Sequence, residues 1–186
     1  FIVGLFKKLA LANYAALYVD RIYEDPSNAN GASLTLATFA FAWQIYFDFS
    51  AYTDMARGSA RIMGFKLSLN FKNPYTSTSL SEFWSRWHIS LSTWFRDYVY
   101  FPLGGNKKGS KRTYINLLSV FIISGLWHGA AWTFIAWGLL HGVGLTAEKA
   151  LNNVKFTKIR LPRLIKITFT FLLVCAGWIF FRSRSI

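Results

Sequence analysis

The stretch that decides the fold is TYINLLSVFIISGLWHGAAWTFIAWGLLHGVGLTA, residues 113–147, which contains no Asp, Glu, Lys or Arg. As one straight helix it would be about 52 Å long at 1.5 Å per residue, whereas the hydrocarbon core of a bilayer is about 30 Å thick. The run must therefore break, tilt strongly or form two segments. Its glycines, at positions 125, 129, 138, 142 and 144, provide break points and allow helices to approach closely.

Composition places this run in a membrane protein. Of 186 residues, 53% are hydrophobic, 19% are aromatic and 16% are charged, and the net charge is +13. High hydrophobicity excludes a disordered chain, and a single cysteine, Cys175, excludes a disulfide scaffold. A nucleic-acid-binding protein can be basic and aromatic, but it has no use for such long uncharged stretches. Three further stretches are candidates for membrane residence: 1–19, 32–56 and 167–181.

The distribution of basic residues predicts the topology. Residues 57–112 hold many Lys and Arg residues against two acids, Glu82 and Asp97. The positive-inside bias assigns this segment to the cytoplasmic side, as it does a second cluster: Lys155, Lys158, Arg160, Arg163 and Lys166. Two successive cytoplasmic loops require an even number of crossings between them. Residues 113–147 are therefore expected to form two membrane segments or a re-entrant hairpin.

The expected fold class is all-α: a polytopic membrane protein with interfacial or re-entrant helices. Residues 1–186 are treated as one membrane-embedded region of a longer protein, truncated at both ends, because the sequence begins with Phe1 and stops just after an apolar run. Residues 57–112 are expected to form its basic, interfacial segment on the cytoplasmic side.

One helix is expected within this segment, over Ser79–Tyr100. Ser79 and Glu82 have the spacing of a capping box, and Pro102 lies just beyond the expected end. Seven apolar residues fall on one broad face: Phe83, Trp84, Trp87, Leu91, Trp94, Phe95 and Tyr98. An aromatic face opposite a polar one is typical of an interfacial helix.

Three histidines are the candidates for chemistry, because a neutral imidazole can accept a proton from a hydroxyl near pH 7. His128 lies near the middle of the uncharged run, as a catalytic base or as a partner in a helix-packing hydrogen bond. His88 points into the aromatic face, and spacing alone favours an interfacial histidine bonded to headgroups or a carbonyl. His141 is expected to be a packing residue, since on one continuous helix it would lie about 220° away from His128.

Asp48 and Asp54 share one apolar segment, where carboxylates are costly. They are candidates for a proton relay, although a salt bridge between helices, with Arg57 or Arg61, is the simpler interpretation. No metal site is expected, because the sequence has no Cys cluster, no His pair with ligand spacing and no carboxylate close to a histidine.

Several motifs resemble the membrane-bound O-acyltransferase family. Residues 81–106, SEFWSRWHISLSTWFRDYVYFPLGGN, resemble its signature, and the match is closest to the bacterial branch that O-acetylates alginate and related exopolysaccharides. The segments GLWHGAAW at 125–132 and WGLLHG at 137–142 resemble the second signature of the family. Residues 43–56 and 64–75 are also similar to this branch.

The resemblance implies an O-acyltransferase that moves an acyl group, an acetyl group above all, from a cytoplasmic thioester to hydroxyls of an exported polysaccharide. By position, His128 corresponds to the catalytic histidine of the family and His88 to the second inward-facing histidine of this branch. The implied donor is a thioester substrate, acetyl-CoA or an acyl carrier, with no tightly bound cofactor. The implied setting is the bacterial inner membrane, multi-pass, with the lipid bilayer and periplasmic acetyltransferase proteins as partners and no nucleic acid.

Three alternatives remain open. Within the family, the protein could transfer D-alanine from a carrier protein toward teichoic acid. A proton-coupled transporter or channel would use the histidines with Asp48 and Asp54 as a relay and would form no covalent product. A basic, lipid-binding scaffold would tolerate the loss of all three histidines.

Overall fold

The computed structural model describes residues 1–153, 161–183 and 185, all of which lie in helices or connecting turns without a strand. The predicted all-α class is therefore confirmed for this part of the chain. It divides into two compact units, Phe1–Asn70 and Phe71–Ile186. Lys155, Lys158 and Arg160, three members of the predicted basic cluster, lie outside the described residues.

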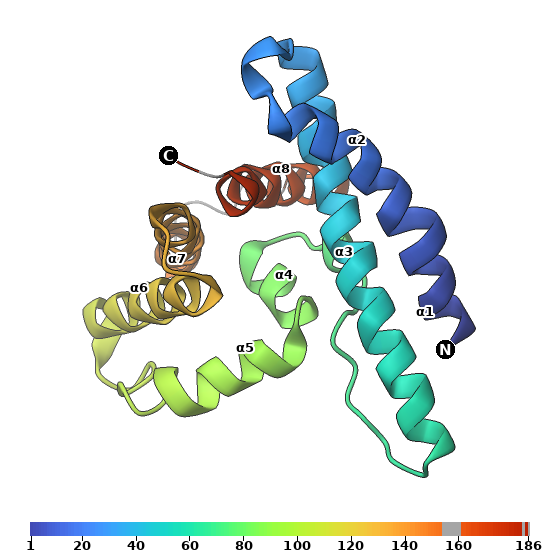
Figure 1. The fold of residues 1–186 in the computed structure, drawn as a ribbon. Coiled ribbons are helices and arrows are strands. Elements are labelled where there is room, and N and C mark those ends of the chain that lie inside the picture. The colour runs from blue at the N-terminus through green and yellow to red at the C-terminus, as the bar shows by residue number, and fades with distance from the viewer. Residues whose placement is uncertain (154–160, 184, 186) are drawn as a thin grey trace. The chain divides into compact units, whose positions relative to one another are not determined.

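The first unit is a hairpin of two long helical arms (Figure 1). One arm is continuous through α1 (Ile2–Phe6), the π-helix η1 (Lys7–Ala12) and α2 (Asn13–Glu24). After a short 3₁₀ turn, η2 (Pro26–Asn28), the other arm is α3 (Gly31–Ile62). The side chain of Asn30 caps α3 by accepting a hydrogen bond from the Ser33 amide at 2.8 Å.

Two ion pairs join the arms of this hairpin. Lys7 Nζ lies 2.7 Å from an oxygen of Asp54, and Lys8 pairs with Asp48. Asp54 also lies 3.7 Å from Arg57, but both residues belong to α3, so this contact is not the predicted salt bridge between helices; the partner of Asp54 on another helix is Lys7. No local pattern matches the two lysines with the two acids, because the register between the arms is set by packing and not by local spacing. Pairing, and not a relay, is the simpler account of both carboxylates.

We expect Lys7 and Asp54 to be energetically coupled. In the full-length protein, Lys7→Met should lower the free energy of unfolding by about 1 to 2 kcal/mol, because it removes a charged hydrogen bond from a partly buried carboxylate. Adding Asp54→Asn to Lys7→Met should recover part of this loss. Chemical unfolding in detergent micelles measures the double-mutant cycle. Additive single effects would mean that the ion pair contributes nothing.

The second unit brings together all three histidines. It begins with the 3₁₀ turn η3 (Pro74–Thr76), followed by α4 (Leu80–Arg86), α5 (Ile89–Phe95) and the π-helix η4 (Arg96–Tyr100). The long helices follow: α6 (Gly109–His128), α7 (Trp132–Asn153) and α8 (Arg163–Arg182). The helix α7 packs against α6, α8 and α4, so it is the central element of this unit (Figure 1).

The uncharged run breaks as predicted. The helix α6 ends at His128, and α7 begins at Trp132. The two helices pack closely at glycines: a Cβ on Gly125 would lie 2.3 Å from the Phe134 carbonyl oxygen, and one on Gly138 would lie 2.3 Å from that of Phe121. The absence of side chains at both positions is what allows this close backbone contact.

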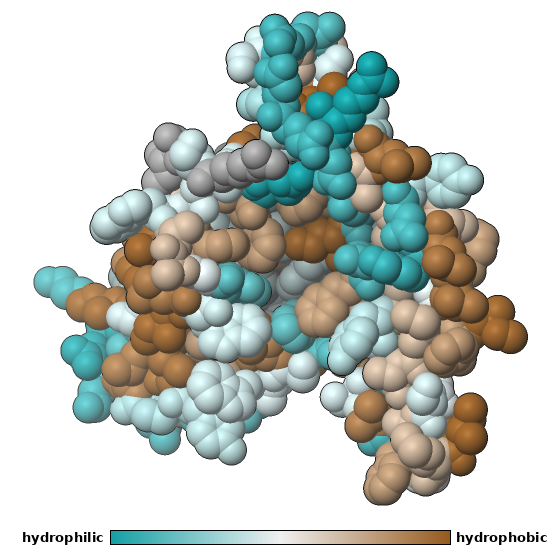
Figure 2. Space-filling model, viewed as in Figure 1, coloured by the Kyte–Doolittle hydropathy of each residue, from teal (hydrophilic) through white to brown (hydrophobic). Residues whose placement is uncertain are grey.

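In the part of the chain that the structure describes, two helices are long and apolar enough to cross a membrane: Ile2–Glu24, which comprises α1, η1 and α2, and α8. The second contains the apolar run predicted at 167–181. By the same measure α3, α6 and α7 do not qualify, so the crossings predicted for residues 113–147 stay a prediction. Many large hydrophobic side chains are exposed on the visible surface, as lipid contact requires (Figure 2).

Candidate active site

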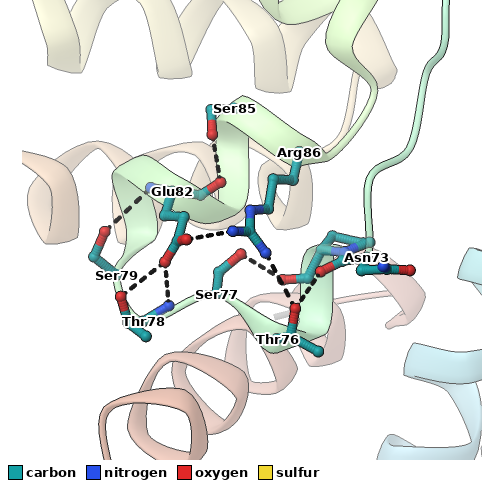
Figure 3. Close-up of polar contacts among 9 residues, drawn as sticks. Asn73, Thr76, Ser77, Thr78, Ser79, Glu82, Ser85 and Arg86 are labelled. Atoms are coloured by element: carbon teal, nitrogen blue, oxygen red, sulfur yellow. Dashed lines mark hydrogen bonds and ion pairs between the residues drawn. The ribbon is translucent and has the colours of Figure 1, made fainter. Parts of the chain in front are cut away.

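The helix α4 begins with a network of polar side chains (Figure 3). Ser79 Oγ accepts a hydrogen bond from the Glu82 amide at 3.1 Å, as the capping box predicts. In a capping box the Glu82 carboxylate would accept a hydrogen bond from the Ser79 amide. Here it accepts hydrogen bonds from the amide and hydroxyl of Thr78 instead, at 2.6 and 2.8 Å. These bonds from Thr78, followed by the charge of Arg86, lower the pKa of Glu82. Glu82 is therefore ionised at neutral pH and pairs with Arg86.

The prediction of one continuous helix over Ser79–Tyr100 is wrong. The chain breaks between α4 and α5, where Trp87 is extended and His88 has left-handed backbone angles, φ 43° and ψ 56°. The Arg86 carbonyl accepts a hydrogen bond from the Lys72 amide at 2.9 Å, so it does not continue the helical ladder. This long-range bond to the preceding loop has no signature in the local sequence.

The break gives the neighbouring side chains of Trp87 and His88 different surroundings. Trp87 is buried and packs against Phe71, Phe83 and Trp178 at ring distances of 5.0 to 5.5 Å. His88 lines a pocket to which Trp87 also contributes. The predicted aromatic face is only partly buried, since Trp94 and Tyr98 are 48% and 68% exposed.

A residue far along the chain completes the start of α4. Glu148, on α7, accepts hydrogen bonds from the amides of Leu80 at 2.8 Å and Ser81 at 3.4 Å. A carboxylate at a helix N-terminus accepts hydrogen bonds from the free amides and interacts favourably with the positive end of the helix dipole. The sequence analysis missed Glu148, because a cap supplied by another helix leaves no pattern in the sequence.

The pocket beside His88 lies between α4, α5 and α6 and is small, with a cavity volume of about 50 Å³. Two hydroxyls line it with His88, those of Ser92 and Ser124; its other lining residues are apolar: Trp84, Trp87, Leu91, Phe95, Val120 and Phe121. Both serines were missed as site residues, because serine in a helical segment carries no signal of its own. The pocket combines a titratable imidazole with hydroxyl groups inside an aromatic wall.

Burial lowers the pKa of His88 to about 4, and the nearby His128 acts in the same direction. His88, which lies outside both apolar helices, is therefore neutral at pH 7 and carries one N–H donor and one acceptor nitrogen.

His128 is the last residue of α6 and is half-buried among aromatic rings. Trp127, Trp137 and Phe181 lie edge-on to it, with ring centroids 4.9, 5.2 and 5.1 Å away. It is not among the residues that line the pocket beside His88. Aromatic rings connect the surroundings of the two histidines: Trp84 and Phe121 line the pocket, and both contact Trp137, which contacts His128.

His141 is fully buried on α7, so the prediction that it packs in the interior is confirmed. Because the helix breaks after His128, the two histidines do not share one helix. Both contact the ring of Trp137, at 5.2 Å in each case.

A family model for MBOAT, the membrane-bound O-acyltransferase family, matches residues 1–185. The chain belongs to this family. The matched region contains the whole of both described units, including the break at His88 and the hairpin turn after His128.

Several curated O-acyltransferase relatives match the entire chain. The "Probable alginate O-acetylase AlgI" of Pseudomonas putida is 45% identical over 190 residues, covering 100% of this chain and 38% of the relative. The "Peptidoglycan O-acetyltransferase" of Helicobacter pylori is 39% identical over 188 residues, covering 100% of this chain and 36% of the relative. The "Teichoic acid D-alanyltransferase" of Bacillus subtilis is 35% identical over 161 residues, covering 80% and 41%.

The chain thus spans little more than a third of the length of the O-acetylating relatives. Within the family, the described part of the chain supplies both histidines that the motifs single out, each on a helix end: His88 before α5 and His128 at the end of α6.

Proposed function

We propose that the protein containing this chain is an O-acyltransferase that moves an acetyl group from a thioester donor to hydroxyls of an exported polysaccharide such as alginate. The observation that supports this best is that one group of contacting aromatic rings joins the pocket of His88 to the ring of His128. His88 lines this pocket with two hydroxyl side chains. Relatives with O-acetylase names match the whole chain.

In the proposed reaction, His128 is the general base. Its imidazole takes the proton of an acceptor hydroxyl while that oxygen attacks the thioester carbonyl. The C–S bond then breaks, and the thiolate takes the proton back from the imidazolium, which leaves an ester and a free thiol. The position of His128 at the C-terminus of α6 supports this role, because the negative end of a helix dipole stabilises a transient positive charge.

His88 is proposed to orient the donor. As a neutral imidazole at pH 7, it can donate a hydrogen bond to the thioester carbonyl, where negative charge develops as the acceptor attacks. The pocket beside it has apolar walls and would exclude water from the acyl group. The donor, acetyl-CoA or an acyl carrier, acts as a substrate and is not a bound cofactor.

The proposed setting is the inner membrane of a bacterium, crossed more than once, with periplasmic acetyltransferase proteins as partners. The basic residues between positions 57 and 112 would attract an anionic donor from the cytoplasm. D-alanyl transfer is the second candidate, because relatives named for that reaction also match.

The test is to measure ester-linked groups on the polysaccharides and teichoic acids of cells that lack the full-length gene, and of the same cells complemented with it. We expect the deletion to lose O-acetyl esters from an exported polysaccharide and complementation to restore them. Loss of D-alanyl esters would assign the second candidate. Proton-coupled flux with unchanged ester content would identify a transporter and overturn the proposal.

The lowered pKa of His88 predicts how acyl transfer depends on pH. Because this pKa is about 4, His88 stays neutral from pH 8 down to pH 5 and becomes protonated only as the pH approaches 4. The ratio of kcat/KM between the full-length protein and its His88→Gln variant should therefore be constant from pH 8 to pH 5. A change in this ratio centred near pH 6.5 would mean that His88 titrates as an exposed histidine.

A further inference from the structure

His141 occupies the point where four helices of the second unit meet. It lies on α7 and is 0% exposed. Its ring lies 5.0 Å from that of Trp84 on α4 and 6.2 Å from that of Phe121 on α6. On the side of α8, a Cβ added to Gly177 would lie 2.5 Å from His141 Nε2, so a glycine is what leaves room for the imidazole.

The imidazole of His141 is polar but, in this buried position, forms no hydrogen bond with the part of the chain that the structure describes. Neither ring nitrogen of His141 has a hydrogen-bond partner among the described residues, and the same holds for Nε1 of Trp84 and of Trp137. These three rings contact one another at 5.0 to 5.6 Å. Four unpaired nitrogens are thus gathered in one buried cluster, which we call the Trp–His cluster: Trp84, Trp137 and His141.

Packing alone does not explain a histidine here. Buried polar groups without partners cost free energy, and such groups in native structures call for a specific explanation. A phenylalanine would fill the space between the two indoles without this cost. Within the cluster, the indoles offer only donors, whereas a neutral imidazole has one acceptor nitrogen. His141 is therefore the one member with an acceptor that a small reorientation of either tryptophan could reach, although the structure itself contains no such hydrogen bond.

The Trp–His cluster connects the two parts of the proposed active site. Trp84 forms part of the wall of the pocket that His88 lines. Trp137 lies edge-on to His128, with a ring distance of 5.2 Å and an interplanar angle of 83°. A change in the orientation of either indole would therefore alter the pocket that His88 lines or the ring that His128 contacts.

We propose that His141 is a positioning residue for acyl transfer: its imidazole holds Trp84 and Trp137 in place and thereby fixes the placement of His88 and His128. The role needs the polar nitrogens of the ring and not only its volume. This inference rests on the proposed function, because it assigns His141 to the same site.

The experiment separates polarity from volume in the full-length protein, reconstituted in lipid vesicles with acetyl-CoA and an oligosaccharide acceptor. We expect His141→Phe to remain folded but to lower kcat between about 10- and 100-fold, with the KM for the donor within about twofold of wild type, since small misplacements of catalytic groups cost this much. We expect His141→Asn, which keeps a donor and an acceptor, to recover part of the lost kcat. Val143→Ala, an exposed position on the same helix, serves as the control.

A wild-type kcat in His141→Phe would overturn the inference, because the ring volume would then be sufficient. The thermal unfolding midpoint of each variant shows whether a lower kcat comes from an unfolded protein or from a folded protein that reacts more slowly. If His141→Phe does not accumulate, Gly177→Ala provides a second test, since its methyl group would displace the imidazole. Activity lost in Gly177→Ala should return in part when His141→Asn is added, and no recovery would contradict the inference.

His128→Ala, measured in parallel, distinguishes the two proposals. Full activity in His128→Ala would remove the proposed function and its mechanism. An inactive His128→Ala protein beside a fully active His141→Phe protein would leave the proposed function in place and remove only the role of His141.

Discussion

Replacing His128 with alanine in the full-length protein is expected to lower acyl transfer by a factor of about 10² to 10⁴, the usual contribution of a general base. The side chain is half-buried and packs against aromatic rings on three helices, so its loss should change the protein's stability far less than its rate. The measurement is the initial rate of ester formation from a labelled acetyl thioester, normalised to the amount of protein in the membrane.

Leu126→Ala is a suitable control, because Leu126 lies on the same turn of α6 and is 52% exposed. It should keep the wild-type rate. A His128→Ala protein present at normal level with more than about half of the wild-type rate would show that His128 is a packing residue. In that case the general base must lie elsewhere.

The second large effect is expected at the contact between α6 and α7. A methyl group at Gly138 would lie 2.3 Å from the Phe121 carbonyl oxygen, a backbone atom that cannot rotate away. Gly138→Ala must therefore push the two helices apart, and we expect it to destabilise the protein by about 3 kcal/mol, at the upper end for overpacked interiors. The measurement is the thermal unfolding midpoint of the detergent-solubilised, full-length protein.

Gly31→Ala provides the matched control, because a Cβ at Gly31 would have no neighbour within 4 Å. It should leave the midpoint unchanged or raise it slightly, since alanine restricts the unfolded chain more than glycine does. Equal midpoints for Gly138→Ala and Gly31→Ala would mean that the backbones of α6 and α7 do not approach as closely as the structure indicates.

The sequence predicted the features that depend on local pattern or on length. The uncharged run at 113–147 was too long for one crossing, which predicted the break after His128. The small side chains of Gly125 and Gly138 predicted close helix packing. The capping role of Ser79 followed from its spacing to Glu82. Each of these rests on residues that lie near one another in the chain.

The features that the sequence did not predict depend on partners far away in the chain. The break before α5 follows from the hydrogen bond between the Lys72 amide and the Arg86 carbonyl. The ion pairs of Lys7 and Lys8 depend on the register of two helical arms. The position of His141 between Trp84 and Trp137 requires the break after His128, so a single-helix projection could not reveal it.

The carboxylate of Glu148 has a consequence for the order in which the protein is made. Leu80 and Glu148 are 68 positions apart, so the amides at the start of α4 have no such partner until the ribosome has passed residue 148. The segment that leads to His88 therefore reaches its final form only after both arms of the α6–α7 hairpin have been synthesised. The helix before His88 is thus capped by a residue of the α6–α7 hairpin.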